Sequence, residues 1–104
     1  MTKFVLVYTG GGYPESEAQQ AEVMAAWGAW YQDLGQAIVD GGNPFGAAKN
    51  VTSSGVHDGA ASAPAPTGYT IISADSLDAA VARVQNHPHL TYGGQVSVFE
   101  TFDM

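Results

Sequence analysis

Three runs of apolar residues have the lengths and residue types of β-strands. Residues 3–9 (KFVLVYT) are rich in β-branched and aromatic side chains and are followed by three glycines. Residues 68–74 (GYTIISA) form a second run, and residues 95–102 (QVSVFETF) form a third. Alternation along a strand puts Phe4, Leu6 and Tyr8 on one face of the first run. In the third run one face carries Val96, Val98, Glu100 and Phe102.

Two stretches repeat apolar residues at the spacing of an α-helix. The first begins at Ser16, an N-cap residue with Gln19 three positions later, and ends at Asp40-Gly41-Gly42. Its apolar stripe comprises Met24, Trp27, Tyr31, Leu34 and Ile38. Gly28 and Gly35 would then lie inside this helix, which predicts close packing against a neighbouring backbone. We expect Trp27 and the adjacent Trp30 in the core.

The second helix has Asp75-Ser76 as its cap and a shorter stripe. The stripe comprises Leu77, Ala80, Val81 and Val84. Between the two helical stretches, residues 45–56 have a weak apolar pattern that indicates an edge strand or one arm of an irregular hairpin. Residues 57–66 (HDGAASAPAP) are mostly small residues and proline, which predicts an exposed loop.

The order strand, helix, two strands, helix, strand predicts an α+β, ferredoxin-like βαββαβ sandwich over residues 1–104, a single domain. Its antiparallel sheet would carry both helices on one face. The first strand also has Val5 and Val7 on its second face, and an uncovered aliphatic face would be a large apolar patch. We therefore expect a second copy of the chain to cover it, giving a homodimer.

Composition excludes several classes of function. Against ten acidic residues the chain has three Lys and Arg, for a formal net charge of -7, so no basic face exists for nucleic acid. The absence of cysteine removes disulfides, thiolate metal sites and cysteine nucleophiles. No apolar run approaches the roughly 20 residues of a membrane span, so we expect a cytoplasmic protein without membrane contacts. We expect no cofactor.

The three histidines are the side chains whose charge ordinarily changes near neutral pH. His87 and His89 flank Pro88 just after the second helix, where a helix C-terminus favours imidazolium. A metal site there would need a third ligand such as Asp58 or Glu100, and no spacing rule supports one, so we predict none.

Four further side chains are candidates for contact with a ligand. His57 precedes Asp58 in the predicted loop, and Tyr8 and Tyr92 offer phenolic hydroxyls. Glu100 lies on an otherwise apolar strand face, where burial would raise its pKa and make it a general base; on an edge strand it would be exposed.

Several short motifs occur in series along the chain: GYTII at 68–72, ADSLDAA at 74–80, PHL at 88–90 and GG at 93–94. Together with the first strand and the turn at 42–44, they make the chain similar to the YCII-related family over nearly its whole length. The resemblance implies a dimeric α/β barrel of ferredoxin-like subunits, which agrees with the uncovered strand face.

The resemblance also implies a histidine–aspartate active site, with a dehydrochlorinase-like member as the enzymatic precedent. No histidine precedes His57, so a family histidine in the first helix has no counterpart, and the matching positions are His89 and Asp58. We expect a small-molecule pocket between sheet and helices, with His89 as acid/base in proton transfer or elimination and Asp58 as its catalytic partner. Tyr8, His57, Tyr92 and Glu100 would contact the ligand. The alternative is a non-catalytic binding or accessory module that has kept the fold and lost the chemistry.

Overall fold

A computed structural model describes residues 1–12 and 14–104. The strands are β1 (Thr2–Gly10), β2 (Ile38–Asp40), β3 (Lys49–Thr52), β4 (Gly55–Asp58), β5 (Pro66–Ala74) and β6 (Gly94–Glu100). The helices are α1 (Glu17–Leu34), α2 (Leu77–Val84) and α3 (Pro88–Thr91), and a 3₁₀ turn spans Gly35–Ala37.

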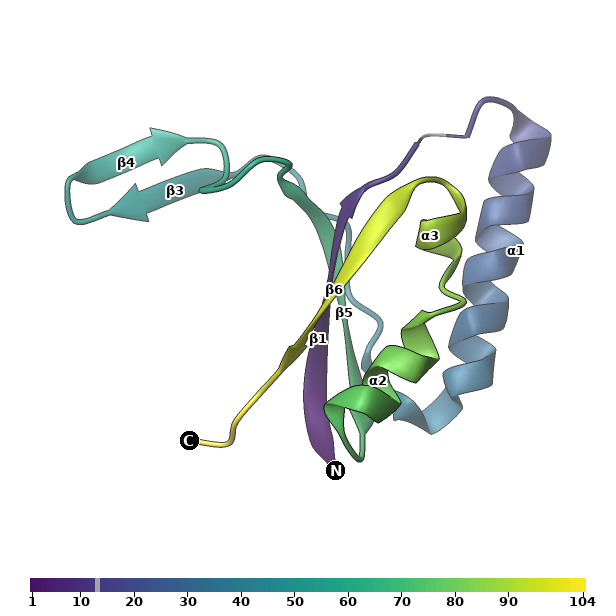
Figure 1. The fold of residues 1–104 in the computed structure, drawn as a ribbon. Coiled ribbons are helices and arrows are strands. Elements are labelled where there is room, and N and C mark those ends of the chain that lie inside the picture. The colour runs from purple at the N-terminus through teal and green to yellow at the C-terminus, as the bar shows by residue number, and fades with distance from the viewer. Residues whose placement is uncertain (13) are drawn as a thin grey trace.

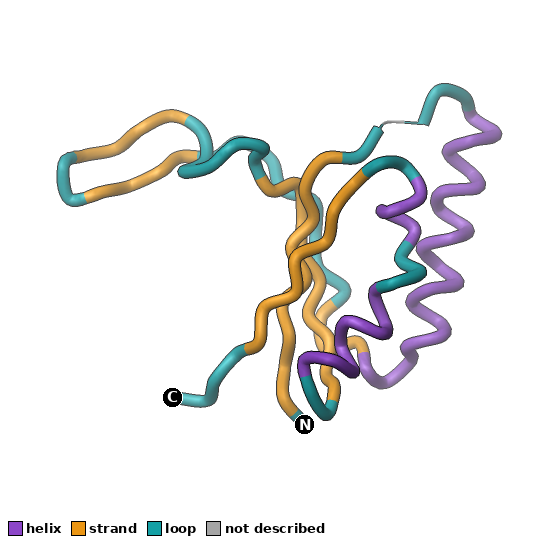
Figure 2. Tube along the Cα trace, in the orientation of Figure 1, coloured by secondary structure: helices purple, strands orange, loops and turns teal. Residues whose placement is uncertain are grey.

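Four strands form the main sheet in the order β2-β5-β1-β6, and every neighbouring pair is antiparallel. The two central strands, β1 and β5, are long (Figure 1), and β2 and β6 form the edges of the sheet. This is the ferredoxin-like arrangement, so the predicted fold class is confirmed. All three helices lie on the same side of the sheet, as the trace in Figure 2 shows.

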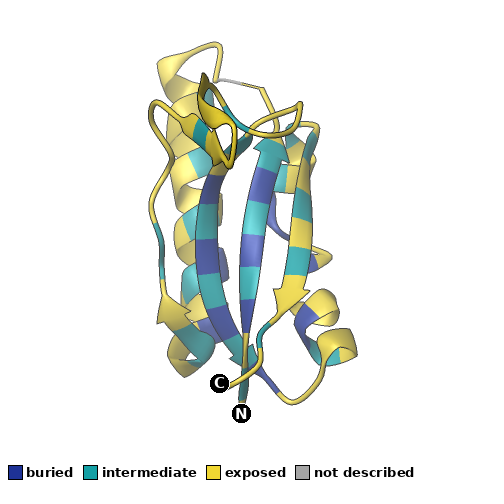
Figure 3. Ribbon diagram, turned by 90° about the vertical axis from the view of Figure 1, so that its left-hand side faces the viewer, coloured by how far each residue is buried: buried dark blue, intermediate teal, exposed yellow. Residues whose placement is uncertain are grey.

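The core lies between the sheet and the helices. Along β1 the burial alternates, with Phe4 and Leu6 inaccessible to solvent, and Ile72 of β5 is equally buried (Figure 3). Trp30 and Leu34 of α1 cover them from the other layer. Burying a side chain of this size stabilises the fold by about 1.5–3 kcal/mol. The strand alternation that the sequence predicts is therefore what builds the core.

Both long helices begin at the serines that the sequence predicts. Ser16 Oγ accepts the backbone N–H of Gln19 at 3.1 Å, and Ser76 Oγ accepts that of Ala79 at 3.1 Å. Each bond satisfies a backbone donor that the helix itself leaves free, which is worth about 0.5–2 kcal/mol. Within the described residues, no helix has both the length and the apolarity to cross a bilayer.

The first helix ends earlier than its apolar stripe predicts. Gly35 caps α1 with φ of 53°, a backbone conformation that glycine adopts at little cost, and the chain then turns to form β2. Ile38 therefore packs on the core from an edge strand and not from a helix. The expected close approach at Gly28 is also wrong, because a Cβ there would meet nothing within 4 Å.

Residues 49–58 form a hairpin that stands away from the main sheet. β3 and β4 pair only with each other, in register from Lys49 opposite Asp58 to Thr52 opposite Gly55. Figure 1 shows this hairpin projecting from the side of the sheet opposite the helices. We call residues 49–58 the arm. The hairpin alternative for this region is confirmed, whereas His57 and Asp58 belong to a strand of the arm and not to the predicted loop.

Candidate functional site

A cavity of about 810 Å³ opens where β1 and β5 approach the segments that lead into and out of the arm. Its walls combine glycines, prolines and aromatic rings; the aromatic residues are Tyr8, Trp27, Tyr31, Phe45, Tyr69 and His89. The lining contains no Asp, Glu, Lys or Arg among the described residues. The cavity is therefore suited to a flat, apolar molecule that carries a few polar groups.

His89 supplies the imidazole ring of this cavity. Its Nε2 lies 2.9 Å from the backbone carbonyl oxygen of Thr9, at the end of β1. A carbonyl can only accept, so Nε2 carries the proton of the neutral ring and Nδ1 carries a free lone pair. Nδ1 has no hydrogen-bond partner in the part of the chain that is described. An imidazole held through one nitrogen in this way can take up a proton on the other.

Two glycines make room for the His89 ring. A Cβ at Gly94 would lie 2.2 Å from Nε2, and a Cβ at Gly11 would lie 2.8 Å from Cε1. Gly11 also has φ of 90°, which disfavours any other residue. Gly11, directly after β1, and Gly94, the first residue of β6, therefore leave space for the ring against Thr9 on two sides.

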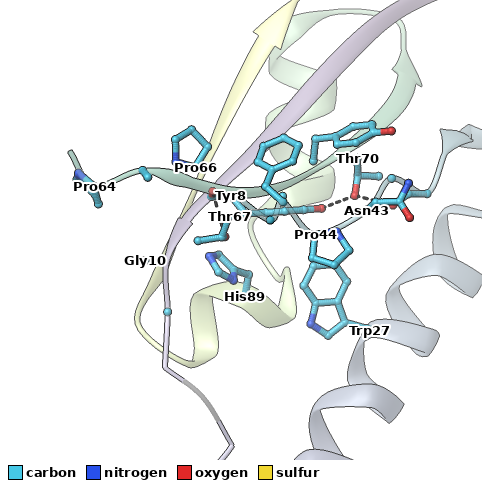
Figure 4. A pocket seen from close by; sticks show the side chains of 18 of the residues that line it. Tyr8, Gly10, Trp27, Asn43, Pro44, Pro64, Pro66, Thr67, Thr70 and His89 are labelled. Atoms are coloured by element: carbon cyan, nitrogen blue, oxygen red, sulfur yellow. Dashed lines mark hydrogen bonds between the residues drawn. The ribbon is translucent and has the colours of Figure 1, made fainter. Parts of the chain in front are cut away.

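His87 lies beneath the cavity and is 1% exposed. It caps α3: its Nδ1 accepts the backbone N–H of His89 at 3.0 Å. Because Nδ1 accepts, the ring proton is on Nε2, which lies 3.0 Å from the Tyr8 hydroxyl and donates to it. Tyr8 in turn donates to Thr70 Oγ1 at 2.7 Å, and Thr70 donates to the Gly41 carbonyl at 3.1 Å (Figure 4). We call His87, Tyr8, Thr70 and the Gly41 carbonyl the relay.

Burial keeps the relay uncharged. Burial, together with a smaller effect of the nearby His89, lowers the pKa of His87 to about 4. Burial also raises the pKa of Tyr8, against the smaller opposing effect of its hydrogen bond to Thr70. The rings of Trp27 and Trp30 lie 4.5 and 4.4 Å from that of His87. The expectation that a helix C-terminus favours a charged His87 is therefore wrong: the ring caps the N-terminus of α3 from an apolar environment.

The structure brings His89 and Tyr8 of the six predicted site residues to the cavity. Asp58 ends β4 on the arm, where its exposed carboxylate pairs with Lys49, and within one chain it does not reach His89. The neighbouring His57 is exposed and contacts Thr52.

The last two predicted residues also lie off the cavity wall. Tyr92 caps the end of α3, and its carbonyl accepts the N–H of Gly12 at 2.9 Å. Glu100 is exposed at the end of the edge strand β6, the alternative in which it is not a buried base. No group of three potential metal ligands occurs among the described residues.

Sequence reasoning missed most of the cavity wall. Trp27 was expected in the core, and Tyr31 lies one turn further along the same helix face. The sequence did contain a signal for these two residues. Trp27 and Tyr31 are an i, i+4 pair of large aromatics on one face of the helix, and this face packs over the end of β1 that carries Tyr8. His87 and Thr70 become functional neighbours only through tertiary contacts, which no local pattern shows.

Comparison with known proteins supports the fold and little beyond it. No family model matches the chain, and no curated protein matches it. One solved structure with a similar fold is the 5-chloro-2-hydroxyhydroquinone dehydrochlorinase from Burkholderia phenoliruptrix AC1100, in complex with 2,5-dihydroxybenzoquinone. The match has a TM-score of 0.55 and 22% identity, and covers 96% of this chain and 93% of the other. The chain thus shares the fold of an enzyme that eliminates chloride and binds a small ring compound.

Proposed function

We propose that the cavity binds a hydroxylated or quinone-like aromatic ring and that His89 acts there as the acid/base of a proton-transfer or elimination reaction. One observation carries the proposal: the Nε2 of His89 donates to the Thr9 carbonyl, so the base is the free lone pair of Nδ1, and the described lining of the cavity holds no carboxylate or amine. Flat aromatic walls and the absence of charged lining residues favour an aromatic ligand.

The chemistry of elimination needs few groups. Nδ1 removes a proton from the substrate, the electrons of that bond form a new double bond, and the leaving group departs as an anion with the electrons of its own bond. The imidazolium that forms still donates from Nε2 to the Thr9 carbonyl, so the ring keeps its position in both protonation states. It then returns its proton to water or to the departing group.

The alternative, a binding module without catalysis, also has support. Nε2 of His89 donates to the backbone carbonyl of Thr9 and not to a carboxylate. A carboxylate would stabilise the imidazolium more strongly than a carbonyl does. Asp58, which was predicted for that role, is on the arm. Both functions use the same cavity, so the experiment has to separate binding from turnover.

The test uses the two ring compounds bound or transformed by the structural neighbour. Chloride release from 5-chloro-2-hydroxyhydroquinone measures turnover, and calorimetric titration with 2,5-dihydroxybenzoquinone measures binding. The variants are His89→Gln, which keeps a polar side chain but no base, and Gln20→Ala on the exposed side of α1 as the matched control.

Turnover that falls at least a hundredfold in His89→Gln, with binding within about fivefold of the unchanged chain and Gln20→Ala unaffected, supports the enzyme. Binding without turnover in the unchanged chain supports the module. If neither compound binds at millimolar concentration, the proposed ligand class is wrong.

We further propose that the functional unit is a homodimer joined through the sheet face that carries no helix. That face presents Val5, Val7 and Ile71, each only half-buried, together with the exposed Phe99. A second copy would remove this apolar surface from water.

A further inference from the structure

The chain exposes more surface than a compact protein of its mass. Its accessible area is 7091 Å², whereas the usual scaling gives about 5,500 Å² for a monomer of 10.8 kDa. Its Cα radius of gyration is 15.1 Å, against about 13 Å for a compact chain of this length. The excess of roughly 1,500 Å² exceeds the ~800 Å² per partner that a stable interface buries.

Two uncovered features contribute to this exposed surface, and both lie on the same side of the molecule. One is the sheet face without helices, which Figure 3 turns toward the viewer, and the other is the arm, which projects from that side in Figure 1. By strand alternation this face presents Lys3 and otherwise uncharged side chains of β1, β5 and β6. The edge strand β2 adds Asp40, which lies opposite Ile71 and accepts a hydrogen bond from Tyr69. In a chain with net charge -7, this face thus carries one basic and one acidic side chain and no net charge, so a second acidic copy can approach it.

The arm also has one face that could contact a second copy of the chain. Val51 lies opposite Val56, and Lys49 lies opposite Asp58, so these four side chains share a face. The two valines are 71% and 67% exposed, and the ion pair leaves the face with no net charge. An isolated two-stranded hairpin is marginally stable in water, so a covering surface would stabilise the arm.

The arm is joined directly to the wall of the cavity. The Phe45 N–H donates to the Thr67 carbonyl at 2.8 Å, which ties the incoming segment to the outgoing one. Phe45 stacks on Tyr69 with 5.7 Å between ring centroids, and both rings line the cavity. Tyr69 belongs to the side of β5 that carries no helix, because its neighbour Thr70 is buried on the other side. A contact that restricts the motion of the arm would therefore also restrict the position of Phe45 and Tyr69 in the cavity wall.

We propose that the arm clasps a second copy of this chain through its Val51–Val56 face, and that this contact holds the Phe45–Tyr69 wall of the cavity in its binding position. A two-fold dimer would make the contact reciprocal, each arm lying against the other chain. The part of the proposal that concerns the cavity rests on the proposed function; the clasp does not.

The test measures assembly and binding separately. Sedimentation equilibrium gives the mass of the unchanged chain and of Val51→Glu/Val56→Glu, in which two acids are added to an exposed face and no buried contact is lost. Two control variants each add one acid elsewhere: Thr52→Glu, on the opposite face of the arm, and Gln20→Glu, on α1.

The expected result is twice 10.8 kDa for the unchanged chain and both controls, and at least tenfold weaker association for the valine double variant. A monomeric unchanged chain would overturn the clasp, and so would a double variant that associates as strongly as the controls. Equal weakening in Thr52→Glu or Gln20→Glu would also overturn it, because charge alone would then explain the effect.

Titration with 2,5-dihydroxybenzoquinone tests the link to the cavity. At a concentration where the double variant is monomeric, we expect its affinity for this compound to fall at least fivefold and to recover at concentrations that restore the dimer. An affinity that is independent of assembly overturns the link and leaves the clasp intact. Absence of binding in the unchanged dimer instead counts against the proposed function, so the two failures are distinguishable.

Discussion

His89 illustrates how glycine positions determine the chemistry of a neighbouring residue. Its ring fits against Thr9 because Gly94 has no side chain. A glycine-to-alanine substitution at position 94 would displace the ring, whereas the same substitution at Gly28 would meet no other atom within 4 Å. Position therefore matters more than residue type for this substitution.

We expect Gly94→Ala to impair His89 without unfolding the protein. The added Cβ would lie 2.2 Å from Nε2, so the ring has to move and its bond to the Thr9 carbonyl is lost. Chloride release or, for a module, ring-compound affinity falls at least tenfold. The matched control is Gly28→Ala, where a Cβ meets nothing within 4 Å; it raises the free energy of unfolding by about 1 kcal/mol because alanine is the better helix former. Equal activity in the two variants would contradict this account.

The buried His87 predicts a pH dependence of stability. Its pKa is about 4 in the folded chain and 6.5 in the unfolded chain, so between these values the unfolded state binds more protons and stability rises with pH. We expect about 3 kcal/mol of the free energy of unfolding to be lost as the pH falls from above 6.5 to below 4. Urea titrations across this range measure the slope, and in His87→Phe the contribution of this group should be absent. A slope unchanged by that substitution would show that other groups cause it.

At the scale of elements, the relay connects parts of the chain that are far apart in sequence. It runs from the cap of α3 through β1 and β5 to Gly41, just after β2. Each member donates to the next, and no buried side-chain donor or acceptor among the described residues lacks a partner. The loss of one hydroxyl should therefore affect more than one contact.

Tyr8→Phe leaves the Nε2–H of His87 and one acceptor position of Thr70 without their partner in a buried environment. We expect it to lower the free energy of unfolding by about 1–3 kcal/mol, as measured by urea denaturation. Tyr69→Phe removes a hydroxyl whose bond to Asp40 is long, at 3.4 Å, and exposed, and should cost well under 1 kcal/mol. Similar costs in both variants would argue against a cooperative relay.

The elements differ in how well the sequence predicted them. β1, β5 and the two serine caps were predicted because alternation and capping are local properties. The end of α1 was missed because Ile38 continues the helical spacing, although Gly35 breaks the helix three residues earlier. Of the six predicted site residues, His89 and Tyr8 line the cavity, whereas Asp58 does not, since the register of an exposed hairpin decides where it lies.

For the whole molecule, charge sets the conditions under which two copies associate. Each copy carries -7, so a dimer brings two like charges together, while its proposed contact surfaces carry no net charge, with Lys3 and Asp40 on the sheet face and Lys49 and Asp58 on the arm. Raising the salt concentration from about 0.02 M to about 0.5 M shortens the screening length well below the size of the molecule. We expect dimerisation to tighten over this range, by sedimentation at a fixed protein concentration. Weakening would indicate that ion pairs between copies dominate the interface.

The buried hydrogen bond between His87 and Tyr8 also provides a way to measure how often the core opens to water. The proton on Nε2 of His87 faces Tyr8 and is shielded by Trp27 and Trp30, so it can meet water only when the helices separate from the sheet. It should therefore give a separate, slowly exchanging imidazole signal in NMR spectra, with a lifetime limited by the opening of the core. A ligand that closes the cavity above it would lengthen that lifetime without touching the proton.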